Sequence, residues 1–477
     1  MSELRVSRWS PGKIAGAMDA RISGPAAGSP QITGVTTDTR ALRPGELFVA
    51  LRGERFDGHH FVEAALDAGA AAVVVDDLSS CPPGTAAIVV DDTLRGLAAL
   101  GHALFVEAGR DGLHSVAVTG SNGKTTVKEL LKVLWGTGGE VWATPGNLNN
   151  HIGVPLTLCG IPRACDHLIV EMGANHVGEI SELIKLAPGD ERIITSIGKA
   201  HLEGFGSLAG VRRGKSEIFE GADRETAAIV PADEAALLLD EEFPGRVLRV
   251  GAGGPAEVQV GWGGLEPDAQ GRLSSRVIVE VDSRKWALSL PLVGRHNAQN
   301  LGAALATLIA RDEVPSEAEL NQALSGLDLP GGRLRVVRAG ELEILDDAYN
   351  ANPTSMRASY EAFASWCDEA GLPRLAVIGD MKELGDFADE EHRQLARWLA
   401  GQALTSIAFV GEFGPVMREA AADINGGAEC VAMSEVDEIS RWLQRRGAAR
   451  VFLKGSRANR LERVIDALRP ESPAPQR

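Results

Sequence analysis

The stretch that most constrains this chain is a glycine-rich loop between an apolar strand and an amphipathic helix. The strand covers residues 114–118, and the loop reads TGSNGKTT over residues 119–126. Apolar side chains then recur with the helical spacing i, i+3, i+4 and i+7, at Val127, Leu130, Leu131 and Leu134. Glycines let a backbone wrap around a phosphate, and the free N–H groups at a helix start point at it. The stretch therefore predicts a phosphate-binding loop in an α/β domain.

The polar residues of this loop have separate expected roles. Lys124 would reach the outer phosphates of a nucleotide, and Thr125 or Thr126 would hold Mg²⁺. The spacing is G-x-x-G-K-T-T rather than the eight-residue Walker pattern, because Val118 occupies the position six before the lysine. A glycine turn that only caps a helix is the alternative, but the strand and helix on either side favour phosphate binding.

Length and charge limit the classes of function. A chain of 477 residues predicts about three domains. A net charge of −17 argues against a nucleic-acid partner, because that affinity depends on neutralising phosphates with cations. The five cysteines are scattered without a CxxC pair, which suits a reducing cytoplasm. We see no signal peptide and no apolar run near the length of a membrane span, and therefore expect a cytoplasmic, monomeric protein.

The pattern of strands and helices divides the chain into three α/β parts. Residues 1–92 predict a small α/β module, and residues 93–329 predict a central phosphate-loop domain with a parallel sheet. Within that domain, residues 257–293 alternate like an antiparallel patch. Residues 330–469 read as a Rossmann-like βα series, and residues 470–477 as a disordered tail.

Two polar stretches stand out in the first module, TTDTR at residues 36–40 and RFDGHH at residues 55–60. Exposed loops with Asp, Arg and His side chains could bind an anionic ligand. Turn and capping chemistry explains the same residues equally well. The residues alone leave both interpretations open.

Two side chains of the central domain follow predicted parallel strands. Glu171 ends the apolar stretch before it, and His201 follows a strand at residues 192–197. Ligands in open α/β sheets bind at the carboxyl ends of strands, so Glu171 is placed to hold Mg²⁺ near the phosphates. His201 is open to a structural or a functional interpretation in equal measure.

Other polar clusters have a binding interpretation beside a structural one. The loop GNLNNHIGVP at residues 146–155 offers several amides, and Asn297 and Asn300 lie one helical turn apart, where they could meet a base edge or cap a helix. Asp346 and Asp347 end the first clear strand of the third part and could take a ribose hydroxyl or begin a helix. No GxGxxG follows that strand, so we predict no dinucleotide site there.

In this order the motifs resemble the Mur ligase family, the ATP-dependent amide ligases of peptidoglycan precursor synthesis. The collinear elements are TGSNGKTT, GNLNNHIGVP, VEMGANH, AHLEGFGS, GKSEIF, GRHNAQN, GGRL, DDAYNANP, GDMKELG and KGSR. With the first-module stretches they span about residues 36–462. They are most similar to the members that join D-alanyl-D-alanine to UDP-N-acetylmuramoyl-tripeptide. The Asp-Asn-Pro-Arg motif of the sister ligase that adds the third peptide residue is absent from the sequence.

The resemblance implies cofactor and metal contacts. The matching residues for the ATP phosphates are Gly120, Ser121, Asn122, Gly123, Lys124, Thr125 and Thr126. Asn297 and Asn300 match adenine contacts, and Asp347 matches a ribose contact. The residues implied to hold two Mg²⁺ ions are Thr125, Glu171, His201 and Lys215. Lys215 matches a lysine that this family carries as a carbamate, and carbamylation requires a neutral amine.

The resemblance also implies catalytic and substrate roles. The implied catalytic set is Lys124, Glu171, His201, Lys215 and Arg333, the last reaching the γ-phosphate from the third domain. Substrate contacts are implied for Thr37, Asp38 and Arg40 of a UDP-binding module and for Asn147 and Asn150. ATP would phosphorylate the peptide carboxylate, and the amine of D-alanyl-D-alanine would attack the acyl phosphate. We expect closure of the last domain about a hinge near residues 326–332.

Three alternatives remain beside this interpretation. One is a folylpolyglutamate-type ligase of the same superfamily, against which the UDP-binding first module argues. Another is a phosphate-loop nucleotide switch or kinase, which would act independently of D-alanyl-D-alanine. A third is a non-catalytic binding relative, which the intact catalytic set disfavours.

Overall fold

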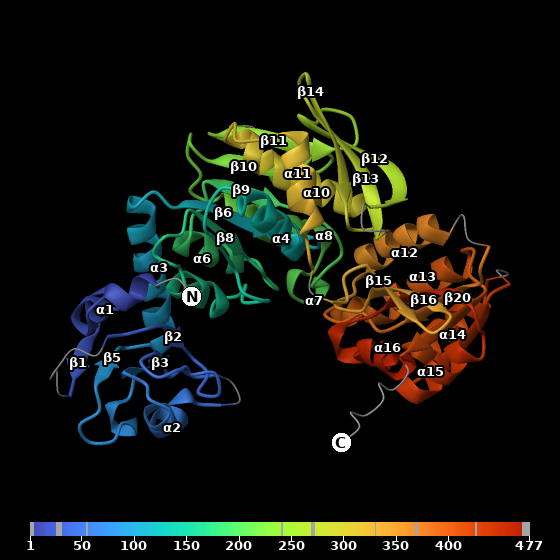
Figure 1. The fold of residues 1–477 in the computed structure, drawn as a ribbon. Helices are drawn as coiled ribbons and strands as arrows, with labels where there is room; N and C mark the ends of the chain where they lie inside the picture. Colours follow the sequence, from blue (N-terminus) through green and yellow to red (C-terminus); the bar gives the residue numbers. More distant parts are fainter. Residues whose placement is uncertain are drawn as a thin grey trace, which may run out of the picture.

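The computed structural model describes residues 4–24, 31–53, 56–239, 242–268, 272–329, 331–367, 371–424 and 427–469. In these residues the chain forms three β-sheets in sequence order, each with its own helices (Figure 1). The predicted α/β class and three-part organisation are confirmed. The tail expected at residues 470–477 lies outside the described residues. None of the described helices has the length and apolar character needed to cross a membrane.

The first unit is a five-stranded sheet with the order β1-β5-β4-β3-β2, in which only β1 runs antiparallel to its neighbour. Its strands are β1 (Arg21–Ser23), β2 (Val35–Thr36), β3 (Leu47–Val49), β4 (Ala72–Val75) and β5 (Ala87–Val89). Its helices are α1 (Pro11–Ala17) and α2 (Val62–Asp67). The residues of β3, β4 and β5 are all buried, as their continuous apolar sequences require.

A long helix, α3 (Thr93–Arg110), joins the first and central units. It begins where the Asp92 carboxylate accepts hydrogen bonds from the N–H groups of Leu94 and Arg95. Leu97, Leu100 and Leu104 pack in the core of the first unit. Phe105 and Ala108 belong to the core of the central unit. The helix is therefore shared, and the predicted boundary after residue 92 stays a prediction.

The central sheet has nine strands in the order β14-β13-β12-β11-β10-β9-β6-β8-β7. The strands are β6 (His114–Thr119), β7 (Val141–Ala143), β8 (His167–Glu171), β9 (Glu191–Ile194), β10 (Ala227–Pro231), β11 (Arg246–Gly251), β12 (Val258–Pro267), β13 (Leu273–Val281) and β14 (Arg284–Leu290). Neighbours from β7 to β12 are parallel, and β12, β13 and β14 pair antiparallel. The antiparallel patch predicted for residues 257–293 therefore extends one edge of the parallel sheet.

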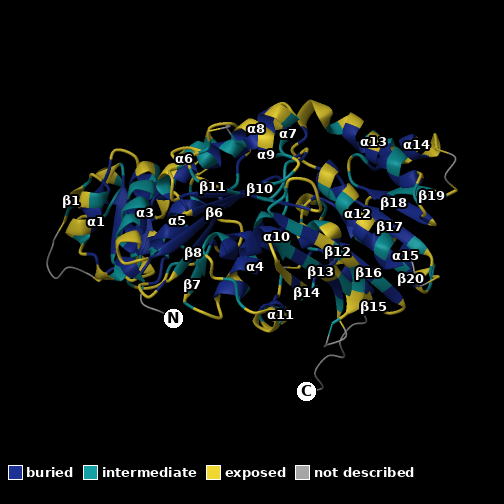
Figure 2. Ribbon diagram, turned by 90° about the horizontal axis from the view of Figure 1, so that it is seen from above, coloured by how far each residue is buried: buried dark blue, intermediate teal, exposed yellow. Residues whose placement is uncertain are grey.

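Helices cover both faces of this sheet, and β6, β8, β9 and β10 lie buried between them, whereas β12, β13 and β14 are partly exposed (Figure 2). The helices are α4 (Lys124–Trp135), α5 (Gly153–Cys159), α6 (Glu179–Leu186), α7 (Leu202–Phe205), α8 (Leu208–Ser216), α9 (Ala235–Leu238), α10 (Arg295–Ala310) and α11 (Glu317–Ser325). Alternation along β6 separates the two layers. Val116 and Val118 pack with α4 and α10, whereas Ala117 packs with α5 and α6.

The third unit is a six-stranded sheet with the order β15-β16-β20-β17-β18-β19, parallel except for β15. Its strands are β15 (Arg335–Ala339), β16 (Leu342–Asp347), β17 (Arg374–Ile378), β18 (Ser406–Val410), β19 (Glu429–Met433) and β20 (Ala449–Lys454). Its helices are α12 (Pro353–Cys367), α13 (Ala388–Ala400), α14 (Gly414–Ala422), α15 (Val436–Gln444) and α16 (Glu462–Leu468). The Rossmann-like βα series is present, and β15, β19 and α12 are additional to the elements we predict from sequence.

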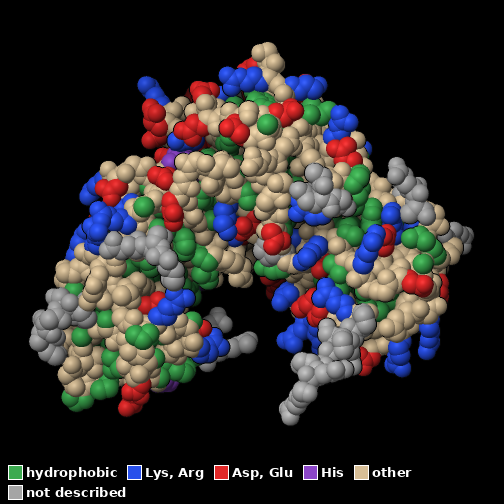
Figure 3. Space-filling view, viewed as in Figure 1, with side chains coloured by type: hydrophobic (Ala, Val, Ile, Leu, Met, Phe, Trp, Pro, Cys, Tyr) green, Lys and Arg blue, Asp and Glu red, His purple; other side chains and the backbone are tan. Residues whose placement is uncertain are grey.

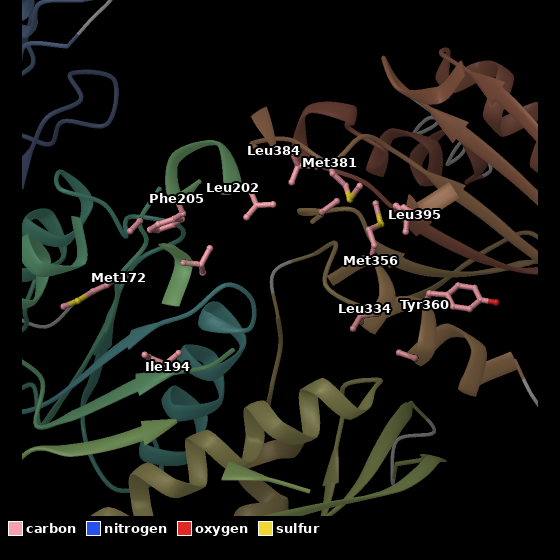
Figure 4. Packing of buried hydrophobic residues seen from close by; sticks show 14 of the residues in the cluster. Met172, Ile194, Leu202, Phe205, Leu334, Met356, Tyr360, Met381, Leu384 and Leu395 are labelled. Carbon is pink, nitrogen blue, oxygen red and sulfur yellow. The ribbon is translucent and has the colours of Figure 1, made fainter. Parts of the chain in front are cut away.

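The third unit packs against the central one through a shared apolar cluster. Leu202 and Phe205 of α7 belong to the same buried cluster as Met381 and Leu384 of the third unit (Figure 4). The first and third units instead face each other across a hollow beneath the central unit (Figure 3). The contacts place the third unit beside the carboxyl ends of the central strands.

Candidate active site

The phosphate loop has the conformation that its glycines make possible. Gly120 and Gly123 have φ values of 141° and 87°, where residues with a Cβ atom are strained. A Cβ atom on Gly123 would also collide with the side-chain oxygen of Asn300. Helix α4 begins at Lys124, so the N–H groups of its first turn open toward the loop. The loop is therefore shaped to bind an anion, as the sequence predicts.

Lys124 folds back on this loop. Its Nζ atom donates a hydrogen bond to the carbonyl oxygen of Gly120 at 2.7 Å. Burial lowers the pKa of Lys124 from its usual 10.5; the charge of Glu171 opposes the shift, and the charge of Arg333 adds to it. The lysine thus stands within electrostatic reach of both an acidic residue of the central unit and a cation of the third unit.

Glu171 is held at the end of β8 by neighbours from two segments, α4 and the loop before α5. Its Oε2 atom accepts a hydrogen bond from Thr125 Oγ1 at 3.0 Å, and its Oε1 atom accepts one from Asn149 Nδ2 at 2.8 Å. The Nζ atom of buried Lys128 lies 3.7 Å from Oε2. A hydroxyl and a carboxylate beside a phosphate loop are the hard oxygen donors that Mg²⁺ takes together with phosphate oxygens. The Thr125–Glu171 pair therefore fits the predicted ion.

Protein ligands alone do not complete such a site. In the part of the chain that the structure describes, no three His, Cys, Asp or Glu side chains gather closely enough to hold a metal ion. Mg²⁺ usually keeps several waters and binds one or two carboxylates plus substrate phosphates. The arrangement is thus that of a site which the nucleotide helps to build.

Lys215 is a buried amine on α8. Its side chain is 1 % exposed, and its Nζ atom donates to the carbonyl oxygen of Ala174 at 3.3 Å. The same atom lies 5.1 Å from the centre of the Phe205 ring. Burial, with a smaller contribution from the charge of Lys124, lowers the pKa of Lys215 well below 10.5. The surroundings therefore favour the neutral amine.

A cavity of about 360 Å³ continues from the phosphate loop toward the third unit. Its lining includes Asn122, Gly123, Asn297, Asn300, Arg333, Asp347, Tyr349 and Lys454. Asn297 Nδ2 donates to the carbonyl oxygen of Val293 at 2.9 Å, and Asn300 Nδ2 donates to Asn297 Oδ1 at 3.1 Å. Asp347 accepts a hydrogen bond from Ser359 at 2.6 Å and is paired with Lys454. The structure thus brings the predicted base and ribose residues into one space.

Arg333 enters the same cavity from the segment between the central and third units. Its guanidinium carbon lies 3.9 Å from the centre of the Tyr349 ring, a cation–π distance. The N–H of Tyr349 donates to the carbonyl oxygen of Gly332 at 3.0 Å, which fixes the ring beside the arginine. The Nε atom of Arg333 is buried without a hydrogen-bond partner among the described residues. A buried donor of this kind is available to an incoming anion.

The five residues predicted to bind substrate lie apart from this cavity. Asp38 and Arg40 form an exposed ion pair at 2.7 Å on the loop after β2, and hydrogen bonds from Arg40 hold the pKa of Asp38 at about 2. The Asn150 side-chain oxygen accepts hydrogen bonds from the N–H groups of Ile152 and Gly153 at the start of α5. Within the described residues, neither these three nor Thr37 and Asn147 are hydrogen-bonded to the phosphate loop.

Sequence interpretation assigns no role to several residues that the structure places here. Asn149 is hydrogen-bonded to Glu171, and Asn352 Nδ2 donates to Asn122 Oδ1 of the phosphate loop at 2.7 Å. Glu383 Oε2 lies 2.6 Å from His201 Nδ1. All three residues lie in the quoted motifs GNLNNHIGVP, DDAYNANP and GDMKELG. The motifs therefore mark these residues, but they do not show which side chain each one contacts.

Comparison with known proteins identifies the family. Three family models match in order: "Mur ligase family, catalytic domain" over residues 31–111, "Mur ligase middle domain" over 118–308 and "Mur ligase, glutamate ligase domain" over 332–457. The UDP-N-acetylmuramoyl-tripeptide–D-alanyl-D-alanine ligases of Bacillus subtilis and Escherichia coli are 34% and 33% identical to this chain. These alignments cover 92% and 91% of it and 93% of each relative.

Solved structures agree with these matches. A crystal structure of MurF from Acinetobacter baumannii superposes with a TM-score of 0.83 at 31% identity, covering 96% of this chain and 98% of the other. MurF ligase from Thermotoga maritima in complex with ADP superposes with a TM-score of 0.77 at 27% identity, covering 91% and 96%. With all three family models matched and relatives aligned over nine-tenths of its length, the chain belongs to the Mur ligase family.

Proposed function

We propose that this protein is an ATP-dependent ligase that joins D-alanyl-D-alanine to UDP-N-acetylmuramoyl-tripeptide and releases ADP and phosphate. The observation that carries the proposal is a phosphate loop with a buried Thr125–Glu171 pair, faced by Arg333 from the third unit. The names of the B. subtilis and E. coli relatives, which align along nearly the whole chain, support the choice of substrates. The enzyme works as a monomer in the cytoplasm.

The chemistry begins with a carboxylate that cannot react with an amine directly. Its oxygen attacks the γ-phosphorus of ATP, the bond between that phosphorus and the β–γ bridging oxygen breaks, and ADP leaves. The amine of D-alanyl-D-alanine then attacks the acyl carbon, the amide forms, and phosphate departs with the former carboxylate oxygen. Negative charge accumulates at the transferred phosphoryl group, where Lys124 and Arg333 neutralise it.

Metal binding follows from the same residues. Thr125 and Glu171 would hold one Mg²⁺ beside the ATP phosphates, and His201 with a carbamylated Lys215 would hold a second. Bound Mg²⁺ supplies positive charge to the phosphate oxygens. Support for the carbamate is the environment of Lys215, since only a neutral amine adds CO₂ and burial favours that form.

The lowered pKa of Lys215 should make the free energy of unfolding depend on pH. In the unfolded chain this lysine is protonated below about pH 10.4. In the folded chain its pKa is lower, so the amine stays neutral until a lower pH is reached. Between these two values the unfolded state binds more protons, so the free energy of unfolding falls as the pH is lowered. Urea unfolding from pH 9.5 to 7 in CO₂-free buffer should show a steeper decline for the wild type than for Lys215→Met. Equal slopes would exclude a strongly lowered pKa.

Substrate and nucleotide binding use all three units. Thr37, Asp38 and Arg40 of the first unit contact the UDP group, and Asn147 and Asn150 of the central unit lie on the loop between β7 and α5, next to the asparagine that meets Glu171. Asn297 and Asn300 contact adenine, and Asp347 contacts the ribose. The hollow between the first and third units gives an elongated nucleotide-sugar peptide room beneath the central unit (Figure 3).

Dependence of phosphate release on both substrates tests this function. With ATP, Mg²⁺ and UDP-N-acetylmuramoyl-tripeptide, we expect steady phosphate release only after D-alanyl-D-alanine is added, because phosphate leaves the acyl phosphate when an amine attacks it. L-Alanyl-L-alanine at the same concentration is the matched control and should give little release. Release that is indifferent to the dipeptide would contradict the proposal and favour a nucleotide switch or kinase.

A further inference from the structure

A contact between the central and third units lies beside the phosphate site. His201 stands at the start of α7, and Glu383 lies in the loop that follows β17. The Nδ1 atom of His201 is 2.6 Å from Glu383 Oε2. The N–H of Glu203 donates to the carbonyl oxygen of Glu383 at 3.3 Å, so backbone and side chain of the same residue both reach α7.

Both partners have an unfavourable backbone conformation. His201 and Glu383 have φ values of 52° and 62°, in the left-handed region that costs a residue with a Cβ atom about 1–2 kcal/mol. Seven described residues other than glycine have positive φ, and two of those seven touch each other across this boundary. Strain of this kind persists where the surrounding structure imposes it, and it concentrates at functional sites.

The stability of the contact does not account for this strain. The Glu383 side chain is 55% exposed, and ion pairs with an exposed partner contribute about 0–1 kcal/mol. The apolar packing of Leu202 with Leu384 and Met381 joins the two units without any need for a charged pair (Figure 4). We therefore infer that the contact orients the His201 ring rather than holding the two units together.

The contact determines which ring nitrogen carries the proton. An ionised carboxylate can only accept a hydrogen bond, so the nitrogen that faces it must be N–H. In the neutral ring the other nitrogen, Nε2, is then left with a lone pair. Glu383 Oε2, at 2.6 Å, is the polar atom that the structure places beside this nitrogen.

We propose that Glu383 is a positioning residue for His201, holding the ring in the Nδ1–H tautomer so that Nε2 faces a divalent cation. The inference rests on the proposed role of His201 as a metal ligand. Carboxylates that orient metal-binding histidines are common, and their loss typically lowers metal affinity 10- to 100-fold. Here the carboxylate belongs to a different unit from the ligand. Metal affinity at His201 is therefore tied to docking of the third unit.

Metal binding without turnover tests this proposal. Mn²⁺ affinity is measured by electron paramagnetic resonance with ADP present and both other substrates omitted. Glu383→Ala should bind Mn²⁺ at least 10-fold more weakly than the wild type, as His201→Ala should. The matched control is Glu391→Ala, which removes the ion pair of Glu391 with Lys199 at the same boundary without touching His201. Equal Mn²⁺ affinities of the Glu383 and Glu391 variants would overturn the proposal.

A second measurement separates positioning from a structural role. Nitrogen-15 spectra of histidine-labelled protein report the tautomer of His201, assigned with His201→Gln. The wild type should give the Nδ1–H pattern, and Glu383→Ala should shift toward the Nε2–H form that a solvated histidine side chain prefers. An unchanged tautomer would overturn the proposal even if Mn²⁺ affinity fell. Neither measurement uses the dipeptide, so their failure is distinguishable from failure of the proposed ligase function.

Discussion

Replacement of Lys215 by Ala is expected to reduce ligation by about 10²–10³-fold, the loss found when one electrostatic group of a phosphoryl or acyl transfer site is removed. The physical reason is that no other side chain on α8 supplies a buried amine that can become an anion. Initial rates of dipeptide-dependent phosphate release measure the effect. Short-chain carboxylic acids should restore part of the activity, because they return a carboxylate to the space that the side chain left.

Two companion variants make this result specific. Lys215→Arg retains a cation but cannot form a carbamate, and it should be as inactive as Lys215→Ala. Lys185→Ala removes an exposed lysine of α6 and should retain full activity. Full activity of Lys215→Ala would remove Lys215 from the mechanism.

Replacement of Arg333 by Ala should lower kcat by about 10²–10³-fold while the KM for ATP changes by only a few fold. Arg333 comes from the segment leading to the third unit, and its unpartnered Nε donor lies in the nucleotide cavity. We expect it to meet the charge that develops on the transferred phosphoryl group more than the charge of bound ATP. Steady-state kinetics at saturating tripeptide and dipeptide give both constants.

The conservative variant sharpens this prediction. Arg333→Lys keeps the charge but loses the planar group that lies on Tyr349, so it should recover little of the lost kcat. Arg335→Ala, two residues along and exposed, is the matched control. A raised KM for ATP with an unchanged kcat would place Arg333 in simple nucleotide binding.

The sequence predicted those parts of the site that depend on local patterns. The phosphate loop requires its glycines, lysine and threonines within eight residues, and Glu171 follows from the end of an apolar strand. Helix α12 is not among the elements predicted, although a proline at its first position and an asparagine before it are typical of a helix start. Its start depends on the Asn352 side chain, which accepts a hydrogen bond from the N–H of Ser355.

Contacts between units could not be predicted in this way. Asn352 and Asn122 are 230 residues apart in sequence, and their hydrogen bond exists only because two separately folded sheets dock. Asn149, to which sequence interpretation assigns no role, illustrates the same limit at short range. Its amide donates to Glu171, and which of three nearby asparagines turns inward depends on the fold of the whole loop.

The helix shared between the first two units has a consequence for how the molecule can come apart. Leu97, Leu100 and Leu104 are fully buried in the core of the first unit, on the same helix whose later turns are buried in the central one. A cut before α3 would leave those leucines exposed on the fragment that keeps the helix. A cut after α3 would expose Phe105 and Ala108, which pack in the central unit. The first two units therefore cannot be separated on either side of α3 without exposing buried apolar side chains.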